Sequence, residues 1–127
     1  MSTKILAVDD SCSMRSMVRG ALEAAGHEVH EAGGGEEALQ YLATGTVDLV
    51  ISDLYMPGMD GLALLAQIRG MRQHRFTPVL VLTTENAEEM KQRGRAAGAT
   101  GWLVKPFQPE QLRDVVARVL GAARVRA

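Results

Sequence analysis

The stretch "DLVISDLYMPGMDG", from Asp48 to Gly61, contains a short apolar run that ends in a carboxylate. Its run "LVIS" at 49–52 is nearly continuous in apolar residues, which is typical of a strand covered on both faces of a parallel sheet. Asp53 follows directly, and Pro57 and Gly58 then predict a loop. A polar residue at a strand end is commonly a turn former, so Asp53 alone predicts no chemistry.

Four further runs predict the rest of the sheet. Three are apolar like the first: "ILAV" at 5–8, "PVLVL" at 78–82 and "WLV" at 102–104. "EVHEA" at 28–32 is more polar and predicts an edge strand. Apolar residues recur at helical spacing in the segments 14–25, 36–43, 61–71, 87–97 and 112–123. Five strand–helix pairs predict an α/β fold, a doubly wound parallel sheet with helices on both faces.

Length and composition restrict the class of protein. The 127 residues suit a single domain, 1–127, and we expect no output domain. With 46% hydrophobic and 23% charged residues the chain is not disordered, and its net charge of −1 argues against a nucleic-acid partner. The sequence contains no apolar run of membrane-spanning length and no signal peptide, and Cys12 is its only cysteine. We therefore expect a cytoplasmic monomer that binds no membrane.

Polar residues follow four of the five predicted strands. They are Asp9-Asp10, Asp53, Thr83-Thr84 and Lys105-Pro106, whereas the edge strand at 28–32 contributes nothing comparable. In open α/β sheets, ligands bind beyond the carboxyl ends of the strands, near a topological switch point. We therefore expect these side chains to converge on one edge of the sheet.

The combination of residue types indicates a metal and an anion. Asp9, Asp10 and Asp53 would repel one another unless a cation joined them, and a small site of hard oxygen ligands favours Mg²⁺. Lys105 supplies a positive charge for an anion, and Thr83 supplies a hydroxyl. Carboxylates can attack phosphoryl groups, and Asp53 is the natural nucleophile because Asp9 and Asp10 are adjacent and better suited to holding metal.

Four motifs in order, "VDDS", "ISDLYMPGMDG", "VLTTE" and "WLVKPF", resemble the receiver domain of two-component response regulators. The resemblance covers essentially the whole chain. "DDSCSMR" and "KPFQPEQL" are most similar to the stand-alone chemotaxis regulators of the CheY type. The resemblance implies a flavodoxin-like (βα)5 fold with strand order 2-1-3-4-5, and it implies that Asp53 accepts a phosphoryl group from a histidine kinase.

The resemblance also assigns the surrounding residues. It implies that Mg²⁺ is bound by Asp9, Asp10, Asp53 and the backbone carbonyl of Tyr55. It further implies that Thr83 and Lys105 engage the phosphoryl group and that the Lys105-Pro106 bond is cis.

Three neighbouring positions modify this pattern. In the family, phosphorylation draws the hydroxyl residue inward, here Thr83, and an aromatic residue then rotates inward. Trp102 has that position in place of the commoner Tyr or Phe, so it either switches or only covers the sheet edge. Thr84 stands where the family usually has a small residue. Tyr55 is hypothesised to shield the phosphoryl group from water.

A basic surface is predicted on the last two helices. Its residues are Lys91, Arg93, Arg95, Arg113 and Arg118, beside Trp102. These charges either form a solvated face or bind an acidic partner peptide, whose association rate should fall as salt rises. The helix at 87–97 has few apolar residues and a central Gly94, which suits an element that moves.

We therefore expect a phosphorylation switch that catalyses only its own phosphorylation and dephosphorylation. Its expected partners are a histidine kinase, an output protein such as a flagellar motor switch component, and a phosphatase. A phosphate sink and a regulator outside chemotaxis remain as alternatives. A small-molecule phosphotransferase is disfavoured because the D-x-D nucleophile motif and a cap domain are missing.

Overall fold

Five parallel strands form one sheet in a computed structural model that describes residues 3–126, with side chains described as far as Gly121. The strands are β1 (Lys4–Val8), β2 (Glu28–Ala32), β3 (Leu49–Ser52), β4 (Val79–Thr83) and β5 (Gly101–Val104). Their order is β2-β1-β3-β4-β5, and every neighbouring pair is parallel. This confirms the expected flavodoxin-like fold and strand order.

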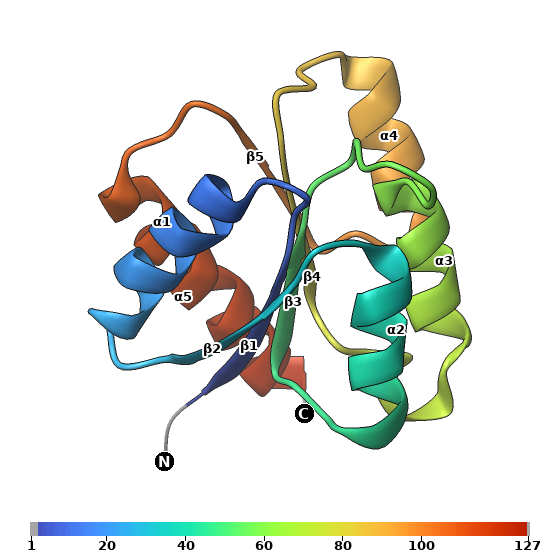
Figure 1. Ribbon diagram of the computed structural model, residues 1–127, viewed down its shortest axis with the longest axis horizontal. Coiled ribbons are helices and arrows are strands. Elements are labelled where there is room, and N and C mark those ends of the chain that lie inside the picture. The colour runs from blue at the N-terminus through green and yellow to red at the C-terminus, as the bar shows by residue number, and fades with distance from the viewer. Residues whose placement is uncertain (1–2, 127) are drawn as a thin grey trace.

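Helices cover both faces of the sheet (Figure 1). They are α1 (Cys12–Glu23), α2 (Gly35–Thr44), α3 (Gly61–Gly70), α4 (Glu88–Ala97) and α5 (Pro109–Arg126), with a short 3₁₀ helix, η1 (Arg72–His74). Helices α1 and α5 lie on one face, and α2, α3 and α4 lie on the other. Two apolar clusters fill the layers. One includes Val18, Leu22, Leu112 and Val116 beneath α1 and α5, and the other includes Ala38, Leu42, Leu64 and Ile68 beneath α2 and α3.

The strands follow the apolar runs with small shifts. All residues of β3 and β4 are buried, as expected for central strands. Strand β4 begins at Val79 rather than Pro78, because proline has no N–H to donate; the Pro78 carbonyl still accepts from the Val50 amide at 3.0 Å. Strand β5 is the second edge, and its residues are only partly buried.

Two helices end differently from the sequence prediction. Helix α1 stops at Glu23, so Ala25 lies exposed in the following turn rather than on the apolar stripe. The turn ends at Gly26, whose φ of 92° is a conformation that glycine adopts without strain. Helix α5 extends beyond the predicted 112–123 at both ends, and Pro109 occupies its first position, where a missing N–H costs nothing.

The start of α3 packs closely against the main chain of Asp53 and Leu54, just after β3. The amide of Gly61, the first residue of α3, donates to the Leu54 carbonyl at 2.7 Å. A Cβ added at Gly61 would lie 2.8 Å from the Leu54 Cα, and closer still to the main-chain oxygen of Asp53. Because these neighbours are main chain, they cannot yield as a flexible side chain would.

Gly61→Ala should therefore lower the free energy of unfolding by roughly 1–3 kcal/mol, measured by urea denaturation. Gly20→Ala is the matched control. Gly20 lies in α1 with nothing within 4 Å of an added Cβ, so that variant should gain about 0.4–1 kcal/mol. Equal stabilities of the two variants would contradict the packing argument.

Candidate functional site

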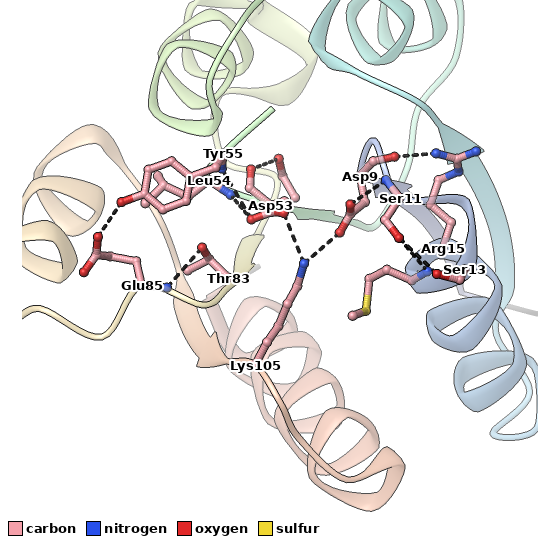
Figure 2. Close-up of polar contacts among 12 residues, drawn as sticks. Asp9, Ser11, Ser13, Arg15, Asp53, Leu54, Tyr55, Thr83, Glu85 and Lys105 are labelled. Carbon is pink, nitrogen blue, oxygen red and sulfur yellow. Dashed lines mark hydrogen bonds and ion pairs between the residues drawn. The ribbon is translucent and has the colours of Figure 1, made fainter. Parts of the chain in front are cut away.

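Three carboxylates meet at the carboxyl edge of the sheet. Asp9 and Asp10 follow β1 and Asp53 follows β3, and each offers an oxygen within 4.8 Å of the others. Lys105 reaches the same place from the end of β5, as Figure 2 shows. The three carboxylates and Lys105 thus lie close together at one edge of the sheet, as the sequence predicts. Their chemical roles are not tested by this geometry and stay predictions.

The Lys105 ammonium bridges two of the carboxylates. Its Nζ lies 3.0 Å from Asp9 Oδ2 and 3.1 Å from Asp53 Oδ2, and the three side chains are only 12%, 7% and 12% exposed, respectively. Burial alone would lower the pKa of Lys105, but hydrogen bonds and charges from the two aspartates outweigh it and raise that pKa. Lys105 is therefore a permanent cation at neutral pH.

Main-chain donors hold the other oxygen of Asp53. Its Oδ1 accepts from the Leu54 amide at 2.6 Å and from the Tyr55 amide at 3.4 Å, while Oδ2 faces Lys105. Both oxygens are thus oriented before any ligand arrives, and Oδ2 points toward the ammonium (Figure 2).

Asp9 and Asp10 are held very differently. Asp9 is buried, and its Oδ1 accepts from the Ser11 amide at 2.9 Å while Oδ2 contacts Lys105. Asp10 is exposed, and its carboxylate has no hydrogen bond or ion pair within the described part of the chain. Asp10 is consequently the carboxylate most available to an added ligand.

The site fits a hard divalent cation. The site brings together three carboxylates and one ammonium, a formal excess of two negative charges. All the ligand atoms are carboxylate oxygens, and the exposed Asp10 leaves room for the waters that Mg²⁺ retains. The predicted ligands Asp9, Asp10 and Asp53 therefore suit the metal. The backbone carbonyl of Tyr55 stays a predicted ligand.

Glu85, in the β4–α4 loop, connects three predicted positions. Its main-chain N–H donates to the buried Thr83 hydroxyl at 3.3 Å, and its carbonyl accepts from Trp102 Nε1 at 3.0 Å. Its carboxylate accepts from the Tyr55 hydroxyl, a hydrogen bond that raises the pKa of Tyr55 and lowers that of Glu85. Glu85 was not predicted from the sequence, because a carboxylate in a loop has no distinguishing pattern.

The remaining predicted switch and modulating residues lie in or near this loop. Among the described residues, the Thr83 hydroxyl makes no hydrogen bond to Asp53 or Lys105, although the Lys105 amide donates to the Thr83 carbonyl at 2.8 Å. The adjacent Thr84 is exposed. Trp102 is half-buried against α4, where a Cβ on Gly94 would lie 2.6 Å from the indole Cζ3. Gly94 thus leaves room for the indole, a packing contact that the sequence alone does not indicate. Whether Trp102 switches stays a prediction.

The edge strand contributes more to the site than the sequence indicates. Glu31 of β2 accepts from Arg15 Nε at 3.0 Å, and Arg15 Nη1 donates to the main-chain oxygen of Asp9. The residues that follow β2 add no carboxylate to the described cluster, but Glu31 within the strand supports the site through Arg15. Glu31 lies in an edge strand that contains other polar residues, so its sequence context does not distinguish it from a solvent-exposed acid.

The predicted basic surface is accessible in part. Arg93, Arg95 and Arg118 are exposed, whereas Lys91 and Arg113 are partly covered. Arg113 Nη2 lies 3.8 Å from Glu110 Oε1, so its charge is partly compensated. A partner for this surface stays a prediction. Over the described residues, no helix combines the length and hydropathy needed to cross a membrane.

Comparisons with known proteins agree on the kind of domain. Residues 5–117 match the family described as response regulator receiver domain. The chain is 38% identical over 122 residues to the transcriptional regulatory protein ResD of Bacillus subtilis, with 96% of this chain and 48% of that protein covered. It is 36% identical to SrrA of Staphylococcus aureus over 124 residues, covering 98% of this chain and 49% of SrrA.

A solved structure resembles the whole fold. The chemotaxis response regulator CheY4 of Vibrio cholerae superposes with a TM-score of 0.90 at 50% identity, covering 94% of this chain and 99% of that one. By contrast, the chain spans about half the length of the curated relatives it matches. The cis Lys105-Pro106 bond, expected from the resemblance, is present.

Removing the bridging ammonium should destabilise the fold. Lys105→Met leaves Asp9 and Asp53 buried without their cation, so we expect a loss of roughly 1–3 kcal/mol in unfolding free energy without Mg²⁺. Added Mg²⁺ should then stabilise this variant more than the unmodified chain, measured as the shift in melting temperature.

Lys91→Met is the control for this experiment, because Lys91 forms no ion pair with the described residues. A Lys105→Met protein as stable as that control would show that the two short contacts contribute nothing.

Proposed function

Because the chain belongs to the response regulator receiver domain family, we propose that it is a phosphorylation switch with Asp53 as the phosphoryl acceptor. Receiver domains accept phosphoryl groups from histidine kinases and interact with output partners. The observation that carries the proposal is the Lys105 ammonium, 3.1 Å from Asp53 Oδ2. It places positive charge beside the attacking oxygen, where the oxygens of an incoming phosphoryl group would gather.

The chemistry assigns a task to each side chain. Asp53 Oδ2 attacks phosphorus, the bond between phosphorus and the donor breaks, and the donor keeps the electron pair. Lys105 neutralises the charge on the transferred oxygens. The Thr83 hydroxyl accepts from the Glu85 amide, so its own proton remains available to donate to a phosphoryl oxygen.

The metal part of the proposal concerns the acidic residues. Asp9, Asp10 and Asp53, with the Tyr55 backbone carbonyl, would hold Mg²⁺. When bound, the ion supplies further positive charge to the phosphoryl oxygens. Lys105 contacts both Asp9 and Asp53, so these two carboxylates are already held side by side.

The switch itself is proposed to run through Glu85. Thr83 and Trp102 bond to the amide and the carbonyl of this one residue. A movement of Thr83 toward a phosphoryl group would therefore displace the main chain that anchors the indole. Because Trp102 also lies against Gly94, that displacement would reach α4.

Output is proposed to occur by protein contact, in chemotaxis and flagellar motor control. The likeness to CheY4 over nearly all of that chain supports this proposal. The matches to ResD and SrrA, which are named transcriptional regulatory proteins, favour a regulator outside chemotaxis as the second candidate. In either pathway the basic residues Arg93 and Arg95 would face an acidic partner. The proposal includes a cytoplasmic location, consistent with a single cysteine, and activity only on the chain's own aspartate.

Incubation with acetyl phosphate and Mg²⁺ tests the acceptor. The intact mass should rise by about 80 Da, one phosphoryl group, as acetate leaves with the electron pair of the broken P–O bond. Asp53→Ala should abolish the adduct, and the fluorescence of Trp102, the only tryptophan, should change in the unmodified chain.

The possible results separate the candidates. No adduct on the unmodified chain, or an adduct that survives Asp53→Ala, would overturn the proposal. An adduct with unchanged Trp102 fluorescence would favour a phosphate sink over a signalling switch.

Tyr55 should slow the loss of the phosphoryl group. Tyr55, 51% exposed, follows Asp53 by two residues and is held by the hydrogen bond from its hydroxyl to Glu85, so its ring would hinder a water that approaches Asp53 from that side. We expect Tyr55→Asn to dephosphorylate severalfold faster, measured by the decay of the adduct. Tyr55→Phe keeps the ring but loses the bond, and should fall between the two. An unchanged rate in Tyr55→Asn rules out the shielding idea.

A further inference from the structure

We propose that Arg15 is a positioning residue for the acidic site, an inference that rests on the proposed function. Arg15, braced by Glu31, holds the peptide unit that joins Asp9 to Asp10. That unit determines where the Asp10 carboxylate lies, and hence how well the site can bind a divalent cation.

The contacts of Arg15 span three elements. Arg15 lies in the first turn of α1, and its Nε donates to Glu31 Oε1 of β2 at 3.0 Å. Its Nη1 donates to the main-chain oxygen of Asp9, at the end of β1. The side chains of Arg15 and Glu31 are only 18% and 25% exposed, and Figure 2 shows the guanidinium directed at the Asp9 main chain.

The oxygen that Arg15 contacts belongs to the peptide bond between Asp9 and Asp10. The Asp9 amide, on the preceding peptide, donates to Ala32 at 3.2 Å, and the Asp9 carboxylate is held by Ser11 and Lys105. Asp10 has no such support, since its carboxylate lacks a partner in the described chain. The direction in which Asp10 leaves the strand thus depends on the peptide plane that Arg15 holds.

Glu31 keeps the guanidinium in place. It accepts from Arg19 Nη1 at 2.7 Å as well as from Arg15, and the hydrogen bonds from both arginines lower the pKa of Glu31. The brace is therefore charged at neutral pH. A guanidinium can bond to Glu31 with one nitrogen and to the Asp9 carbonyl with another, whereas a lysine ammonium is a point charge without that fork.

Arg19 provides a natural control. It bonds to the same Glu31 and also to Glu23 at 3.1 Å, but among the described residues it makes no hydrogen bond to Asp9. Arg19 therefore ties α1 to β2 without touching the site, and its side chain is more exposed, at 45%. If Arg15 only tied α1 to β2, replacing Arg15 or Arg19 should have the same effect on Mg²⁺ binding.

Charge and position predict opposite effects on cation binding. If Arg15 acted only through its charge, its removal would make the site more negative and tighten the binding of Mg²⁺. If Arg15 positions Asp10, its removal should weaken binding despite the more favourable charge. Arg15→Lys separates the two further, because it keeps the charge but lacks the planar fork through which Nε and Nη1 donate to Glu31 and to Asp9 at once.

The test is a calorimetric titration with Mg²⁺ alone, without a phosphoryl donor. We expect the Mg²⁺ dissociation constant to rise severalfold in Arg15→Gln and in Arg15→Lys, and to stay within about twofold of the unmodified chain in Arg19→Gln. Circular dichroism and melting temperature show that each variant is folded. If Arg15→Gln does not fold, Arg15→Lys carries the test, and it should bind Mg²⁺ more weakly than the unmodified chain.

Three results would overturn the inference: binding by Arg15→Gln as tight as or tighter than that of the unmodified chain, unchanged binding in Arg15→Lys, or equal weakening in Arg19→Gln. These outcomes differ from failure of the proposed function. In that case the unmodified chain itself would bind no Mg²⁺ or gain no phosphoryl group from acetyl phosphate.

Discussion

The site depends on one constraint: several carboxylates are crowded together at one edge of a parallel sheet. Parallel strands bring their carboxyl ends together, so the residues that follow them must share a small volume. Here that volume contains three carboxylates, and Lys105 joins Asp9 to Asp53 from the far edge of the sheet. A buried charge is tolerated only when it is paired, so each group keeps the others in place. The same arrangement leaves the exposed Asp10 carboxylate without a partner among the described residues, and therefore available to an added ligand.

Several connections from this cluster to the rest of the fold pass through main-chain atoms. Leu54 and Tyr55 hold Asp53 by their amides, and Glu85 contacts Thr83 and Trp102 by its amide and carbonyl. Main-chain contacts transmit displacement well, because a peptide unit cannot change its direction without moving its neighbours. The acidic edge is therefore mechanically joined to α4 and β5 through one short loop.

The sheet and the central residues of the site could be predicted because both follow from local rules. Strands buried on two faces are apolar throughout, and their carboxyl ends necessarily share an edge, which brings Asp53 and Lys105 together. The braces around them follow no such rule. Arg15 and Glu31 are 16 residues apart, and Tyr55 and Glu85 are 30 apart. Each pair forms only because the fold brings two polar side chains into contact, and no periodicity in the sequence indicates it.

The close packing of Trp102 against Gly94 makes the effect of a substitution at one of these positions depend on the residue at the other. The flat indole fills the volume of an ordinary helix side chain, so a methyl group at position 94 clashes while the indole is present. A smaller ring at position 102 leaves a void while Gly94 remains, and voids in packed regions are costly. Replacing Gly94 by alanine would stabilise α4 by roughly 1 kcal/mol of helix propensity only if position 102 first carried a smaller side chain. The two positions are therefore coupled, and a Cβ at position 94 costs more stability beside Trp102 than beside a smaller ring.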